Sequence, residues 1–150
     1  MNVHATPEPV TTLDWNDQTY RILLTQNESN GRIGIFESIC PLNGGPPRHL
    51  HQKEDETFYV LRGEMVFWLD GATITKGPGE VFLAPRGKEH TFTVAGSEPA
   101  RFLVHLTPGG FEGFFQSAAA RNLRIPEDLD AITKLAADYS MIITGPPLRA

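Results

Sequence analysis

The 150-residue sequence lacks several features that define large classes of protein. It contains one cysteine, Cys40, so no disulfide can form within the chain, which fits a reducing compartment. No run approaches about 18 consecutive apolar residues, so no membrane-spanning helix is predicted. The first ten residues have neither the basic nor the apolar region of a secretory signal. We therefore expect a cytoplasmic protein.

Positive charge is also scarce. Lys and Arg total 13 against 18 Asp and Glu, which gives a formal net charge of −5. The basic residues are scattered from Arg21 to Arg149 without a cluster, which argues against a nucleic-acid partner. The sequence also has no glycine-rich phosphate loop and no Gly-x-Ser-x-Gly motif, so neither a nucleotide enzyme nor a serine hydrolase is indicated.

Short apolar or alternating runs fill the first two thirds of the chain, and glycines and prolines separate them. Turn signals at intervals of roughly 8–12 residues are typical of an all-β sandwich or barrel. Asp70-Gly71, between two such runs, predicts a tight hairpin. The predicted strands are Tyr20–Leu24, Arg32–Cys40, Thr57–Leu61, Glu64–Leu69, Ala72–Thr75, Glu80–Ala84, His90–Ala95 and Arg101–Thr107.

The last third of the sequence changes to a helical pattern. Apolar residues recur at i, i+3, i+4 and i+7 over residues 111–121, which predicts an amphipathic helix. Pro126, followed by two acidic residues, predicts the start of a second helix that continues to about residue 139. A short strand is expected over Ser140–Thr144.

This pattern predicts a single domain over residues 1–150. We expect the barrel to cover about residues 13–107 and a helical extension to cover about residues 111–144. The sequence shows no internal repeat and no linker long enough to divide it.

Three histidines and one glutamate have the spacing of a metal site. His49 and His51 are two residues apart, so their rings leave the same face of a strand. Glu56 comes five residues after His51, so the polar insert must turn or bulge before this carboxylate can point inward. His90 follows a tight turn at residues 85–87. Mixed nitrogen and oxygen ligands favour one divalent transition metal (Fe, Mn, Ni, Cu, Co or Zn) over Mg or Ca.

Two sequence motifs resemble those of the cupins. The first cupin motif is glycine, then His-x-His, three or four residues, Glu, six residues and Gly; here it includes His49, His51, Glu56 and Gly63. The second is Gly, five residues, Pro-x-Gly, two residues and His; here it stands as Gly79, Pro85, Gly87 and His90. Asn43 takes the place of the leading glycine, and Val94 stands where the family often has Asn.

The resemblance implies a fold and a metal site. Cupins form a small double-stranded β-helix (jelly-roll) barrel, usually paired into dimers. For this chain the resemblance implies such an all-β barrel, followed by the two C-terminal α-helices, with His49, His51, Glu56 and His90 around one metal. The strand Glu64–Leu69 is apolar on both faces, which also favours a homodimer.

Strand alternation predicts which residues line the interior beside the metal. Phe58 and Val60 follow Glu56, and Phe92 follows His90, on the same face, which predicts a mostly apolar pocket for a small molecule. Arg48 is a candidate for binding an anionic substrate, with a charge at the rim as the alternative.

Three further polar residues have simpler expected roles. Glu54 and Asp55 are expected to be solvated charges at the turn. His105 is expected to pack on a sheet face or lie at the surface, with a fifth metal ligand as the alternative.

The segment from Pro46 to Gly63 resembles small bacterial cupins related to quercetinase-type dioxygenases. This resemblance implies a non-haem dioxygenase that reacts a small enol or phenolic substrate, flavonol-like or otherwise aromatic, with O2. Glu56 would then be both a ligand and the general base, with its pKa raised by the apolar wall. The alternatives are a metal-dependent isomerase or lyase, and a non-catalytic cupin that binds a small molecule or metal.

Overall fold

The computed structural model describes residues 9–149, and this part of the chain contains eleven strands and two short helices. The strands are β1 (Thr11–Trp15), β2 (Gln18–Leu24), β3 (Gly34–Cys40), β4 (Pro47–His51), β5 (Asp55–Arg62), β6 (Glu64–Leu69), β7 (Ala72–Lys76), β8 (Val81–Ala84), β9 (His90–Ala95), β10 (Ala100–Thr107) and β11 (Met141–Pro147). The helices are α1 (Gly113–Ala120) and α2 (Leu129–Asp138). All eight predicted strands are confirmed, with ends that move by at most two residues, and the short strand expected over Ser140–Thr144 is present as β11.

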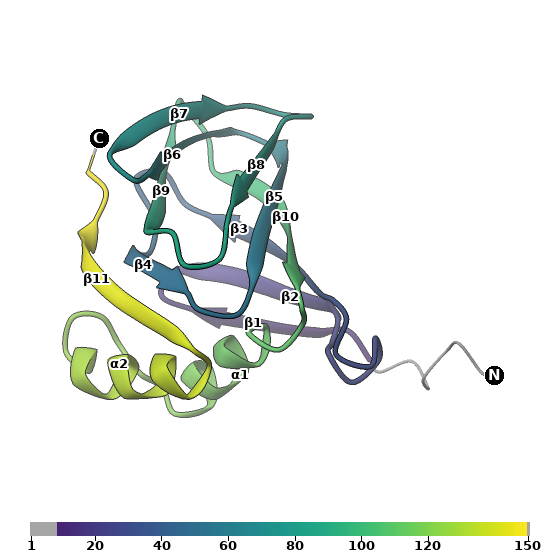
Figure 1. Cartoon of the computed structure of the whole chain (residues 1–150). Coiled ribbons are helices and arrows are strands. Elements are labelled where there is room, and N and C mark those ends of the chain that lie inside the picture. The colour runs from purple at the N-terminus through teal and green to yellow at the C-terminus, as the bar shows by residue number, and fades with distance from the viewer. Residues whose placement is uncertain (1–8, 150) are drawn as a thin grey trace.

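The strands form two antiparallel sheets that make a jelly-roll barrel. One sheet has the order β1-β2-β3-β10-β5-β8, and the other has the order β11-β4-β9-β6-β7. Figure 1 shows the two helices together at one end of the barrel, below β1 and β11. Neither helix is long and apolar enough to cross a membrane, within the residues described. The predicted all-β fold with two C-terminal helices is confirmed.

Aromatic side chains fill the space between the sheets. Phe67 is 1% exposed and stacks on Phe82 with 4.1 Å between ring centroids. Toward the helices, Phe115 of α1 stacks on Tyr20 at the same centroid distance. The helix α1 therefore closes one end of the barrel by inserting its phenylalanines into it.

The second helix begins later than the sequence predicts. Residues 125–128 form turns, and α2 starts at Leu129 rather than at Pro126. Just before this start, the Asp128 carboxylate accepts a hydrogen bond from the Arg124 backbone N–H and makes no capping bond to the helix. Local side-chain bonds of this kind compete with the helix.

The first hairpin was also not predicted. β1 starts at Thr11, and Asn16 and Asp17 turn the chain with φ of 51° and 61°. Asn and Asp accept positive φ more readily than most residues, so this pair makes a two-residue hairpin turn. The predicted turn at Asp70-Gly71 has the same conformation, with φ of 47° and 91°, and is confirmed.

Candidate metal centre

Three strands from the two sheets bring the four predicted side chains together. β4 carries His49 and His51, and β9 begins at His90, which pairs directly with His49. Glu56 comes from β5, in the opposite sheet. The turn after His51 moves the chain from one sheet to the other, so the carboxylate faces back toward the histidines. A turn in the polar insert is therefore confirmed.

The cluster is tight and buried. One ligand atom from each of the four residues lies within 4.8 Å of all the others, and all four side chains are buried. The Glu56 Oε2 atom lies 2.7 Å from His51 Nε2 and 3.3 Å from His90 Nε2. His105, on the outer side of β10, lies outside this cluster.

Backbone carbonyls orient two of the three imidazole rings. His49 Nδ1 lies 2.7 Å from the Pro47 carbonyl oxygen, and His90 Nδ1 lies 3.0 Å from the Lys88 carbonyl oxygen. A carbonyl only accepts hydrogen bonds, so each Nδ1 carries the proton and donates it. The neutral forms of both rings then offer the Nε2 lone pair to a metal.

Burial and mutual charge set the protonation of the cluster. Burial, then the neighbouring His90 and His51, lowers the pKa of His49 to about 3. Burial alone would raise the pKa of Glu56, but His51 and His90 outweigh it and lower the pKa below its ordinary value. Burial would lower the pKa of His90, but the bond to Glu56 raises it. The expected rise in the Glu56 pKa is therefore wrong: this group is a carboxylate at neutral pH.

These properties fit a divalent transition metal. His51 Nε2 lies close to Glu56 Oε2, yet it has no partner with hydrogen-bond geometry. A cation shared by the two atoms would satisfy both. Three imidazoles and one carboxylate form a mixed donor set, which suits Fe, Mn, Ni, Cu, Co or Zn.

We expect acid to destabilise the metal-free protein through His49. Below pH 6.5 the unfolded chain binds a proton that folded His49, with its pKa near 3, does not bind. The stability that this group contributes is present above pH 6.5 and is lost as the pH falls, by up to about 1.4 kcal/mol per pH unit. His90 has the opposite effect on stability, because its pKa is raised. The stability that His90 contributes is present below pH 6.5 and is lost as the pH rises through its folded-state pKa.

Urea unfolding in the presence of a chelator, from about pH 6.5 to about pH 4.5, measures this slope. The free energy of unfolding of the His49→Asn variant should depend less steeply on pH than that of wild type, because the variant lacks the His49 imidazole. An equally steep slope in the variant would contradict the assignment.

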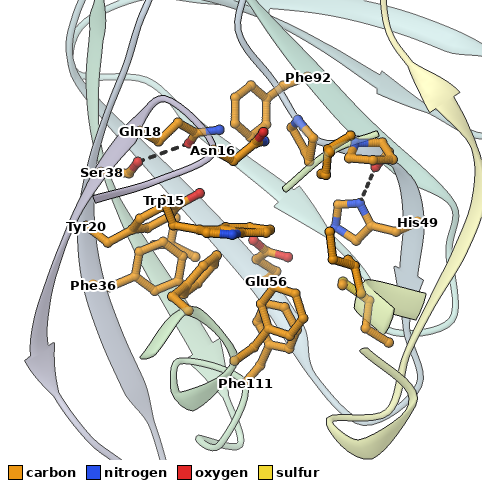
Figure 2. Close-up of a pocket in the computed structure, with 18 of the residues that line it drawn as sticks. Trp15, Asn16, Gln18, Tyr20, Phe36, Ser38, His49, Glu56, Phe92 and Phe111 are labelled. Carbon is orange, nitrogen blue, oxygen red and sulfur yellow. Dashed lines mark hydrogen bonds between the residues drawn. The ribbon is translucent and has the colours of Figure 1, made fainter. Parts of the chain in front are cut away.

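An aromatic pocket opens onto the cluster at His49 and Glu56. Its wall includes Phe58, Phe92 and Phe102 from the barrel and Phe111, Phe114 and Phe115 from the helical extension. Figure 2 shows Glu56 in the middle of the pocket, His49 on one side, and the pair Gln18 and Ser38 on the other. Ser38 Oγ donates a hydrogen bond to Gln18 Oε1 at 3.3 Å. The pocket is therefore apolar between two polar ends.

Sequence reasoning found only part of this wall. Phe58 and Phe92 line the pocket as predicted, whereas Trp15, Tyr20 and Gln18 were not predicted to line it. Side chains alternate between the two faces of β2, and this alternation would have predicted that Gln18 and Tyr20 point into the barrel. Burial raises the pKa of Tyr20, so its hydroxyl stays protonated at neutral pH.

Two of the predicted substrate-binding residues lie elsewhere. Arg48 projects from the other face of β4, where its Nη2 donates to the Thr144 carbonyl at 3.1 Å and its guanidinium lies over Trp68. Val60 is fully buried in the core and does not line the pocket. Adjacent strand residues point to opposite faces, so Arg48 cannot share the pocket with His49. This corrects the predicted role of Arg48.

Of the two acidic residues before Glu56, only Glu54 differs from expectation. The Asp55 side chain is 38% exposed, as expected for a solvated charge, and forms an ion pair with Arg86, with 3.1 Å between Oδ2 and Nη2. Glu54 is only 4% exposed, so its expected role as a solvated charge is wrong. Its Oε2 lies 3.8 Å from His51 Nδ1. Burial raises the pKa of Glu54, against the opposing effect of the His51 charge.

Comparison with known proteins agrees with the fold and the site. Residues 37–106 match the family model described as "Cupin domain". Together with the barrel and its motifs, this match identifies the chain as a cupin.

Within this family the chain resembles quercetinase-type proteins. It is 33% identical over 101 residues to quercetin 2,3-dioxygenase of Bacillus subtilis, which covers 67% of this chain and 30% of the relative. It is 26% identical over 140 residues to quercetin 2,3-dioxygenase of Aspergillus japonicus, which covers 85% of this chain and 40% of the relative. The chain therefore spans well under half the length of either relative.

Solved structures show the same fold. The crystal structure of a predicted oxalate decarboxylase from Thermotoga maritima superposes with a TM-score of 0.62 at 20% identity. The match covers 66% of this chain and 93% of that one. At this identity the likeness establishes the barrel, and the chemistry must be argued from the site.

Proposed function

We propose that this cupin is a metal-dependent dioxygenase that reacts a small enol or phenolic compound, flavonol-like or otherwise aromatic, with O2. The observation that carries the proposal is the aromatic pocket that opens directly onto His49 and Glu56. The likeness to two quercetin 2,3-dioxygenases supports the choice of substrate class.

In this proposal His49, His51, Glu56 and His90 hold one divalent transition metal. When bound, the metal would supply an open coordination position for a substrate oxygen and the redox chemistry that O2 requires. Phe58 and Phe92 would pack against the flat ring of the substrate and exclude water. Glu56, as a carboxylate, would accept the proton of the substrate hydroxyl.

Oxygen uptake tests this proposal. Protein reconstituted with each candidate metal is supplied with a flavonol, a catechol and a β-diketone in an oxygen-electrode cell. We expect O2 consumption that requires both metal and one of these substrates. Conversion of a substrate without O2 consumption would instead favour a metal-dependent isomerase or lyase. Binding without any conversion would favour a non-catalytic cupin.

A further inference from the structure

Glu54 and His51 form a buried pair outside the set of metal-binding atoms. The side chain of Glu54 lies in the turn between β4 and β5, and its Oε2 atom has no hydrogen-bond partner. It faces His51 Nδ1 at 3.8 Å, and this nitrogen also has no hydrogen-bond partner. Both side chains are at least 95% buried.

This environment sets His51 apart from the other two histidines. The Nδ1 atoms of His49 and His90 are held by backbone carbonyls. No carbonyl takes this role for His51 among the residues described, and the carboxylate of Glu54 occupies that side of the ring instead. Buried polar groups without a partner are costly, so two that face each other favour a direct bond.

We propose that Glu54 is a positioning residue that accepts the Nδ1–H of His51 and so directs the Nε2 lone pair of that ring toward the metal. The proposal rests on the proposed metal site and not on the dioxygenase reaction. Closing the gap from 3.8 Å to hydrogen-bond distance requires a shift of roughly 1 Å, which small rotations of the Glu54 side chain supply. A carboxylate behind a ligating histidine fixes its tautomer and raises its basicity.

Metal affinity is the first readout. The Co²⁺ dissociation constants of wild type, Glu54→Leu and Glu54→Gln are measured at neutral pH by competition with a chromophoric chelator. We expect Glu54→Leu to bind Co²⁺ about 10–100-fold more weakly. The effect of Glu54→Gln should be smaller, because its amide oxygen still accepts a hydrogen bond. The control is Asp55→Asn, which alters the next carboxylate, outside the cluster, and should leave the affinity unchanged.

The histidine tautomers of the metal-free protein are the second readout. In ¹⁵N-labelled wild type, NMR should show His51 protonated at Nδ1, and Glu54→Leu should weaken that preference. A merely structural role for Glu54 would lower stability and leave the tautomer unchanged. If Glu54 accepts the His51 N–H, its removal leaves that buried donor without a partner, so the thermal unfolding temperature should fall in either case and the tautomer is the deciding readout.

Two results would overturn the proposal. One is a folded Glu54→Leu variant with wild-type Co²⁺ affinity, and the other is an unchanged His51 tautomer in that variant. If wild type itself binds no Co²⁺, the proposed metal site fails, and the tautomer measurement still decides whether Glu54 orients His51.

Discussion

Turnover by the Glu56→Gln variant is expected to fall about 10²–10⁴-fold, the range found for removal of a general base. The amide keeps the size of the side chain and one neutral oxygen that can face a metal, but it cannot accept the proton of a substrate hydroxyl. Metal content should therefore fall only modestly while the rate of O2 uptake falls steeply. Parallel measurement of both quantities separates loss of the base from loss of the metal.

Asp55→Asn is the matched control for this substitution. Asp55 precedes Glu56 in the sequence but binds Arg86 outside the cluster, so its variant should keep wild-type turnover. Full activity in the Glu56→Gln variant would show that Glu56 is not the general base of the proposed reaction.

The largest effect on stability is expected from Phe67→Ala. Phe67 stacks on Phe82, contacts Phe58 edge-on with 5.0 Å between ring centroids, and is 1% exposed. Truncation to alanine leaves a cavity between the sheets, and substitutions of this kind cost about 3–5 kcal/mol. Urea unfolding, followed by tryptophan fluorescence, measures the change in the free energy of unfolding.

Ile74→Ala is the control for that cavity. Ile74 pairs with Phe67 across the β6–β7 ladder but is 48% exposed. Its truncation should cost less than about 1 kcal/mol. Similar losses in the two variants would mean that Phe67 does not have the central packing role described above.

Local patterns in the sequence were sufficient for most of the barrel and for the metal-site cluster. His49 and His51 share a face because strand side chains alternate, and this alternation is independent of the rest of the fold. The spacing of the two motifs then predicts Glu56 and His90 as the remaining members of the cluster, and the structure brings all four side chains together. The proposed homodimer and the cytoplasmic location stay predictions.

Features that depend on distant parts of the chain could not be predicted in the same way. The burial of Glu54 follows from the passage of the chain between sheets at the β4–β5 turn, which no local pattern encodes. The pocket wall made by Trp15 and Phe111 joins the first hairpin to the segment before α1, nearly a hundred residues apart. The residues that form this pocket wall come together only in the folded barrel, so no local sequence pattern predicts them.

Metal content, measured by elemental analysis on untagged protein, tests the central claim most directly. Wild type and the His49→Ala/His90→Ala double variant are compared after identical reconstitution with each candidate divalent ion. We expect about one transition metal per wild-type chain, bound by four protein ligands, and almost none in the variant. A wild-type protein that holds no metal after reconstitution, or a double variant that holds as much as wild type, would contradict the proposed centre.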